Sequence, residues 1–144
     1  MWLFLPFGFF SVVADPADVD RVVVRARSQA HLVALLGYVT VKLGYSTLSW
    51  PITATPLHDY PYRVVLTRVV LAEVMCAFVG DSLRYGNFKN EAHRVGILPG
   101  AALHDVWATM RGVEDAAARV VGSGHAEAHE GRVVRPLRQR PRRR

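Results

Sequence analysis

Apolar and polar residues alternate along two stretches of the chain and predict two half-buried β-strands. These stretches are residues 21–27 and 60–66, where small or branched apolar side chains alternate with Arg25, Arg27 and Arg63. A strand directs successive side chains to opposite faces, so Arg25 and Arg27 share a face with Val23, opposite to Val22, Val24 and Ala26. Arg63 likewise shares a face with Pro61 and Val65, opposite to Tyr62, Val64 and Leu66. The pattern therefore predicts a sheet with one buried face and one polar face.

Two further strands are expected from composition and alternation. Residues 2–13 are rich in aromatic and β-branched side chains, and Pro6 and Gly8 indicate a kink within a single strand. Residues 47–55 alternate clearly, and Pro51 places that strand at an edge, because proline has no N–H for a central ladder. The expected sheet has four strands.

Helical spacing of apolar residues predicts two helices between and after these strands. The first covers residues 29–36 and is expected to end at Gly37. The second runs through residues 67–78, with Thr67 as its N-cap and Gly80 as its end. This second helix is apolar nearly all round, which predicts burial on more than one side.

A third helix is expected over residues 101–119, after loop-like residues 81–100 with a short turn at residues 90–94. The element order is then β-β-α-β-β-α-α, with helices after pairs of strands. The sequence predicts an α+β fold, in which a four-stranded, mainly antiparallel sheet carries its helices on one face. Cys76, the only cysteine, is expected to be a small buried hydrophobe of the second helix.

Charge divides the 144 residues into a domain and a tail. The net charge is +6, but seven arginines lie within residues 132–144, and the rest of the chain carries one more acidic than basic side chain. No apolar period survives after residue 121. We therefore expect a single domain over residues 1–121 and a disordered linker and arginine-rich tail over residues 122–144.

The apolar N-terminus invites comparison with a signal peptide or a membrane span. It has no basic residue at its start, it is interrupted by Pro6 and Gly8, and it leads directly into an acidic segment. It is also shorter than the roughly 20 apolar residues that a spanning helix needs. A buried strand and a soluble, cytoplasmic protein are the expectation, and the single cysteine excludes an internal disulfide framework.

Several short motifs resemble a family of small proteins of bacteria and their phages. The motifs are MWLF and GFFSVV at residues 1–4 and 8–13, VRAR at 24–27, DYPYR at 59–63, YGNFK at 85–89 and LHDVW at 103–107. The resemblance covers about residues 1–113 and implies a single domain. No activity is established for that family, so the resemblance implies no mechanism. The family's helix after VRAR usually begins with acidic residues, and this chain has Ser28-Gln29-Ala30-His31 there.

The polar face of the predicted sheet offers a candidate binding site for an anion. If the strands of residues 21–27 and 60–66 are neighbours, their arginines converge, and guanidinium groups bind phosphates or carboxylates while nearby aromatic rings stack on bases. The candidate residues are Arg25, Arg27, Asp59, Tyr60, Arg63, Tyr85, Asn87 and Lys89. The alternative is that the arginines are solvated or paired with Asp59 and Asp81, that Phe88 fills the core, and that Gly86-Asn87 is a simple turn.

Catalytic and metal sites have weaker support. His104, next to Asp105, is the best candidate acid or base, but no nucleophile motif or phosphate loop accompanies it. His125 and His129 have the spacing of helical zinc ligands, yet glycines flank them, so we expect no metal and no cofactor.

The tail is the strongest electrostatic feature of the sequence. Its arginines are Arg132, Arg135, Arg138, Arg140, Arg142, Arg143 and Arg144. Such segments bind nucleic-acid phosphates without reading sequence, although a tail of this kind can also serve only to keep a protein soluble. We expect a non-enzymatic binding protein for an anionic partner, most simply nucleic acid. The alternatives are a phage-borne protein-interaction factor that modulates a host protein, and an enzyme acting on an anionic small molecule.

Overall fold

The computed structural model describes residues 1–106 and 108–109, in two compact units, Met1–Leu103 and His104–Arg144. The second unit is described only over residues 104–106 and 108–109, which are helical. Most of the predicted helix at residues 101–119, the predicted domain end at residue 121 and the arginine-rich tail lie outside the described residues.

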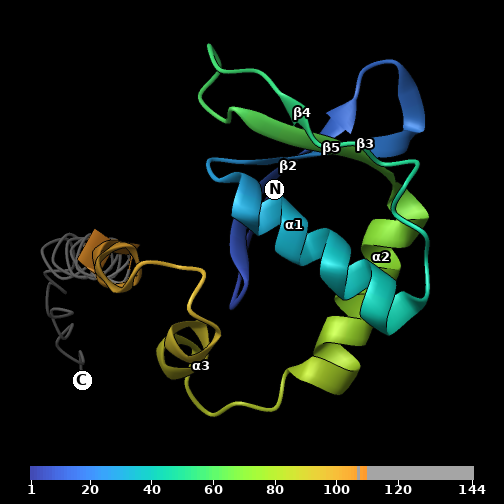
Figure 1. Cartoon of the computed structure of the whole chain (residues 1–144). Coiled ribbons are helices and arrows are strands. Elements are labelled where there is room, and N and C mark those ends of the chain that lie inside the picture. The colour runs from blue at the N-terminus through green and yellow to red at the C-terminus, as the bar shows by residue number, and fades with distance from the viewer. Residues whose placement is uncertain (107, 110–144) are drawn as a thin grey trace, which may run out of the picture. The chain divides into compact units, whose positions relative to one another are not determined.

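The first unit is an α+β structure, as the sequence predicts, but its element order differs (Figure 1). Three strands precede the first helix, so the order is β-β-β-α-β-β-α-α, and a π-helical segment follows each of the first two helices. The elements are β1 (Trp2–Leu5), β2 (Gly8–Asp15), β3 (Asp18–Ala26), α1 (Gln29–Tyr38), η1 (Val39–Leu43), β4 (Thr53–Ala54), β5 (Tyr62–Thr67), α2 (Arg68–Ala77), η2 (Phe78–Ser82) and α3 (Phe88–Val95).

The described strands form one antiparallel sheet of five strands, in the order β1-β2-β3-β5-β4. The prediction of four strands was wrong at the N-terminus, where residues 2–13 form a hairpin and not one kinked strand. Leu5 pairs with Gly8, so Pro6 and Phe7 form its two-residue turn. A proline is tolerated there because a turn residue does not donate to the ladder.

The predicted strand at residues 47–55 is confirmed only at Thr53–Ala54, where β4 pairs with β5. Thr53 lies opposite Arg63, and the same register would place Pro51 opposite Val65. Pro51 has no N–H to donate at that position, so the chain leaves the edge of β5 there. A clear two-residue period therefore overestimated the length of this strand.

The first predicted helix continues beyond Gly37. Helix α1 passes through this residue and runs into η1, which ends at Gly44 with a left-handed φ of 74°. A glycine ends a helix when the chain must adopt that conformation, and Gly37 does not adopt it.

Helix α2 begins as predicted. The Thr67 hydroxyl accepts a hydrogen bond from the N–H of Val70 at 3.2 Å, which satisfies one of the free donors of the first turn. The helix does not close at Gly80, because η2 continues through that residue. Residues 90–94, predicted as a short turn, belong to the two-turn helix α3.

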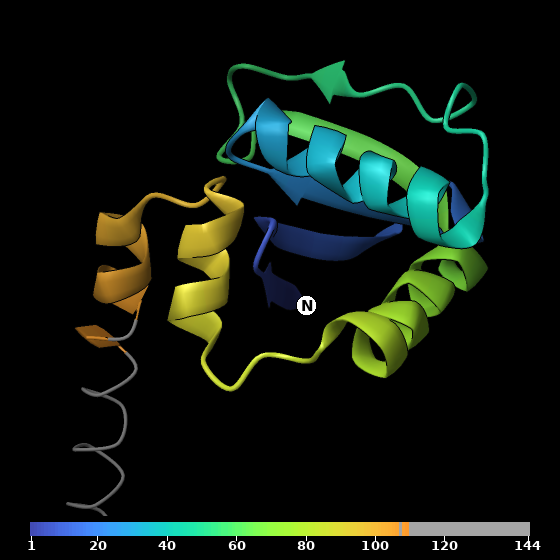
Figure 2. The same cartoon turned by 60° about the horizontal axis from the view of Figure 1, so that its bottom comes forward.

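Helices α1 and α2 cover the same face of the sheet (Figure 1), and Figure 2 shows α1 lying over the strands. The core between them is formed by side chains of both layers. It includes Phe10, Val12, Val22, Val24, Val64 and Leu66 from the sheet, and Leu32, Leu35, Val70 and Val74 from the helices.

Two predictions about the helices were wrong. Helix α3 does not share the face of α1 and α2: its Phe88 packs on Phe4, with ring centroids 5.1 Å apart, and Phe4 lies on the face opposite to Leu3 and Leu5. Helix α2 is covered on one side only, because Val69 is 63% exposed and Cys76 is exposed as well. A helix at the edge of a two-layer domain keeps a free side even when its sequence is apolar.

A buried histidine gives the fold a pH dependence. His31 in α1 is 9% exposed, lies edge-on to Phe10, and its Nδ1 has no hydrogen-bond partner among the described residues. Burial lowers the pKa of His31 below its usual value of 6.5, against a smaller opposing effect of the Phe9 backbone. The unfolded chain therefore binds a proton that the folded chain resists, and acid favours unfolding.

We expect the free energy of unfolding to fall as pH drops below about 6.5, with a contribution from His31 of at most about 1.4 kcal/mol per pH unit. Urea denaturation of the wild type and of His31→Leu between pH 7.5 and 5 measures this. The substitution should flatten the pH profile in that window. Parallel profiles would show that His31 is not responsible.

Candidate anion-binding site

One row of cross-strand partners runs across the whole sheet and contains two arginines side by side. Trp2 pairs with Ser11, Ser11 with Arg25, Arg25 with Arg63, and Arg63 with Thr53. The neighbours of Ser11 and Arg25 along their strands are buried in the core under α1 and α2, as is Val64 next to Arg63, so the row lies on the opposite face. The two predicted arginine strands are thus adjacent, as the candidate site required.

The pairing brings the backbones of the two arginines especially close. The N–H of Thr55 donates to the carbonyl of Pro61 at 2.7 Å, which shows that the odd-numbered residues of β5 direct their backbone groups toward β4. Arg25 and Arg63 therefore form a non-hydrogen-bonded pair, in which the Cα atoms are only about 4.5 Å apart. Like charges directly opposite each other destabilise a sheet.

Tyr60 and Ser11 organise the arginines of this face. The guanidinium carbons of Arg25 and Arg27 lie 5.1 and 5.3 Å from the centroid of the Tyr60 ring, which is 8% exposed. Such cation–π contacts hold the guanidinium planes against the ring. Arg25 Nη2 also donates to Ser11 Oγ at 2.7 Å.

The arginines differ in how far their charge is already balanced. Arg27 pairs with Asp59 at 2.6 Å, and both side chains are largely exposed, so the alternative of simple ion pairing holds for this residue. For Arg25 and Arg63, no salt bridge is found within the described part of the chain. The Nε atoms of both are buried without a hydrogen-bond partner there. Within the described residues, the charges of these two arginines are therefore not balanced by a carboxylate.

Three candidates from the YGNFK motif have structural positions in or next to α3. The side chain of Asn87 caps α3 by accepting from the N–H of Asn90 at 3.2 Å. Tyr85 packs edge-on against Phe88, and burial, with a smaller effect of Glu91, raises the pKa of its hydroxyl. Lys89 is half-buried in the first turn of α3. Phe88 packs on an apolar cluster, as the alternative interpretation expects, but Asn87 is a helix cap and not part of a simple turn.

The remaining candidates lie in the second unit. His104 is exposed at its beginning, and the tail arginines, His125 and His129 lie outside the described residues. Within residues 1–106 and 108–109, no group of three or more His, Cys, Asp or Glu side chains is arranged to hold a metal ion.

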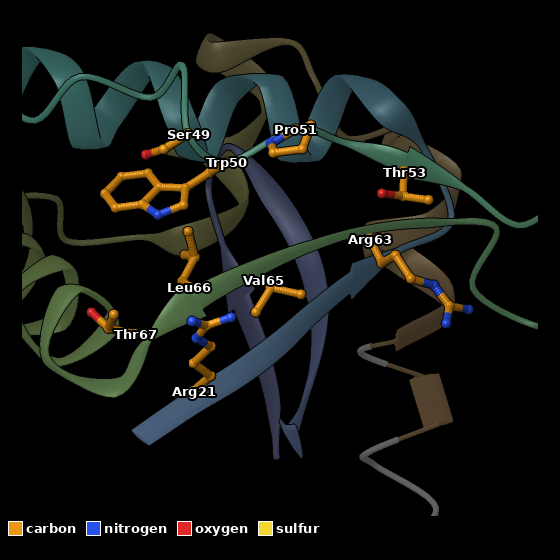
Figure 3. A pocket seen from close by; sticks show the side chains of 9 residues that line it. All are labelled: Arg21, Ser49, Trp50, Pro51, Thr53, Arg63, Val65, Leu66 and Thr67. Carbon is orange, nitrogen blue, oxygen red and sulfur yellow. The ribbon is translucent and has the colours of Figure 1, made fainter. Parts of the chain in front are cut away.

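A pocket of about 370 Å³ lies at the outer edge of β5, next to the polar face (Figure 3). Arg63 belongs to both the arginine pair and this pocket. The lining residues are Arg21, Ser49, Trp50, Pro51, Thr53, Arg63, Val65, Leu66 and Thr67. Sequence reasoning missed Arg21 and Trp50 as members of a site, although the position of Pro51 in an alternating stretch was a signal that the strand is interrupted there.

Comparisons of the chain with protein-family models, with curated proteins and with solved structures return no match. The resemblance to small bacterial and phage proteins therefore stays a prediction. Among the described helices, none has both the length and the apolar character needed to cross a membrane.

Proposed function

We propose that this protein binds single-stranded nucleic acid in the cytoplasm, through the sheet face that carries Arg25, Arg63 and Tyr60 and through its arginine-rich tail. The observation that supports this most is the direct pairing of Arg25 with Arg63 across β3 and β5. Two cations on directly opposed residues, neither in a salt bridge within the described residues, suit a phosphate group that would neutralise their repulsion.

The surroundings of the pair favour a nucleic acid over a simple anion. Trp2, at the end of the same row of cross-strand partners, is 73% exposed, and exposed aromatic residues on a sheet face are a common platform for unpaired bases. The seven arginines of residues 132–144 add electrostatic attraction for a phosphate backbone, independent of its sequence.

The test is a fluorescence-anisotropy titration of a labelled single-stranded oligonucleotide at about 50 and 200 mM salt. The full-length chain should bind at low salt and lose affinity steeply at high salt. Deleting residues 122–144 should reduce the salt dependence but leave measurable binding by the sheet face. Absence of binding by the full-length chain at low salt would contradict the proposal.

A protein-binding role is the second candidate, and exposed apolar side chains on the helical layer favour it. Val33 of α1 and Val69 of α2 are 56% and 63% exposed. A pull-down that returns one stoichiometric protein, and loses it when both valines are replaced by aspartate, would favour this role. The enzymatic alternative has no such support. It required four basic side chains to face a common cleft, and only Arg63 among them is a described residue that lines the pocket; the other three are Arg25, Arg27 and Lys89.

A further inference from the structure

The pocket beside β5 reaches the backbone edge of the strand. Arg63, Val65 and Thr67 direct their side chains to the polar face, whereas Leu66 points into the core and is 1% exposed. Leu66 nevertheless lines the pocket together with both of its neighbours. Because alternating side chains cannot all face one side, the pocket must contact the main chain between them.

The backbone groups of Val65 face this space. The hydrogen bond between Thr55 and Pro61 and the pairing of Thr53 with Arg63 fix the odd-numbered residues of β5 as those whose N–H and C=O point away from β3. No other described strand pairs with β5 on that side beyond Arg63. Val65 thus presents one donor and one acceptor, adjacent and in plane, to the pocket.

Pro51 keeps this edge open. In the register of β4, Pro51 would lie opposite Val65, where it cannot supply an N–H, and the chain at residues 49–51 forms the far wall of the pocket instead. Thr53 already occupies the next pairing position along this edge, opposite Arg63. A long peptide strand added at Val65 would therefore collide with β4. The space suits a short, flat ligand better than an extended chain.

The walls of the pocket are an indole and two arginine side chains. Figure 3 shows Trp50 near Leu66 at one end, the Arg21 guanidinium beside Val65, and the Arg63 guanidinium directed away from the Trp50 end. Asp18 holds Arg21 through its Nε at 2.9 Å. A flat group inside the pocket would contact Trp50 and Arg21, while a phosphate attached to it would meet Arg63 outside.

From this geometry we propose that the pocket binds one nucleobase of the single-stranded nucleic acid. The base contacts the Trp50 indole, its hydrogen-bonding edge pairs with the N–H and C=O of Val65, and its phosphate lies on Arg63 and Arg25. Bases present adjacent donors and acceptors that match such a backbone pair. The volume of about 370 Å³ lies in the range of small-ligand sites. This inference rests on the proposed function and adds a defined binding site for one base.

The test compares an oligonucleotide with a sugar-phosphate strand of equal length that lacks bases, both titrated against the full chain. Two variants probe the pocket and leave every arginine in place. Pro51→Val restores the N–H opposite Val65 and should let β4 extend into the pocket, and Trp50→Leu removes the indole. Pro56→Val, at an exposed position outside the pocket, is the matched control.

The wild type and the control should bind the oligonucleotide about 5- to 100-fold more tightly than the abasic strand, and both pocket variants should lose most of this difference. Far-UV circular dichroism verifies that each variant is folded, and Trp50→Leu keeps the test decisive if Pro51→Val does not fold. Equal binding of both strands by the wild type would overturn the base pocket and leave the proposed function intact. Absence of binding to either strand would overturn both.

Discussion

Replacing Gly8 by alanine should destabilise the protein by about 1–3 kcal/mol or more. A Cβ on Gly8 would lie 2.4 Å from Cζ of Phe10 and 3.0 Å from Cβ of His31. Phe10 is fully buried in the centre of the core, so its ring cannot move aside without disturbing the packing between β2 and α1. Gly8 is therefore required by the closeness of its neighbours and not by an unusual backbone angle.

Gly37→Ala is the matched control for this prediction. Gly37 lies within α1, a Cβ there meets no atom within 4 Å, and the helix should gain about 0.5–1 kcal/mol from the alanine. Urea denaturation measures both variants. Adding Phe10→Leu to Gly8→Ala removes the clashing end of the ring and should recover part of the loss. Equal effects of the two glycine substitutions would show that the clash is not the cause.

The sequence was informative where a local rule decides the structure. The alternation through residues 21–27 correctly separated Val22 and Val24 from Arg25, because a strand has only two faces. Thr67 was correctly identified as a helix cap, since its hydroxyl and the receiving N–H are three residues apart. These features depend on neighbours along the chain, and a single sequence shows them directly.

The predictions failed where partners distant in sequence decide. Apolar and polar residues do alternate through residues 47–55, but β4 is shorter than this stretch. Its length depends on the pairing with β5, where Pro51 would lie opposite Val65 and cannot donate a hydrogen bond. Gly37 was wrongly identified as a helix end, because the backbone continues into η1 and uses Gly44. Cys76 was wrongly expected to be buried, because no layer covers that side of α2.

The candidate site also combines features that the sequence predicts with features that depend on distant partners. The faces of Arg25 and Arg63 could be predicted, and their direct opposition follows only from the register of β3 with β5. The YGNFK motif had the composition of a binding loop, yet Asn87 caps a helix and Phe88 packs on Phe4. Trp50 lies in the site because the chain leaves the sheet at Pro51, and no local pattern of side chains encodes the resulting pocket.

The double substitution Arg25→Ala/Arg63→Ala should weaken binding of single-stranded nucleic acid about 10- to 100-fold. Each lost phosphate contact should reduce the slope of log affinity against log salt by about 0.7, so the double variant should lose about 1.4. The removal of repulsion between directly opposed cations should offset part of the cost of losing the contact of Arg25 with Tyr60 and its hydrogen bond to Ser11, so the free energy of unfolding should fall by no more than about 1–2 kcal/mol. A binding site is identified by this combination of a large loss of affinity and a small change in stability.

Lys42→Ala/Arg84→Ala provides the control, because it removes the same charge at two exposed positions outside the arginine row. Anisotropy titrations at several salt concentrations and urea denaturation should be measured on both double variants. If net charge alone drives binding, the two variants will weaken it equally, and the sheet face has no special role. If the arginine pair is structural, Arg25→Ala/Arg63→Ala will lose stability in proportion to affinity. A selective loss of affinity and salt slope, with stability largely preserved, is the result expected of a phosphate-binding pair, because the two arginines are directly opposed in the register of β3 and β5.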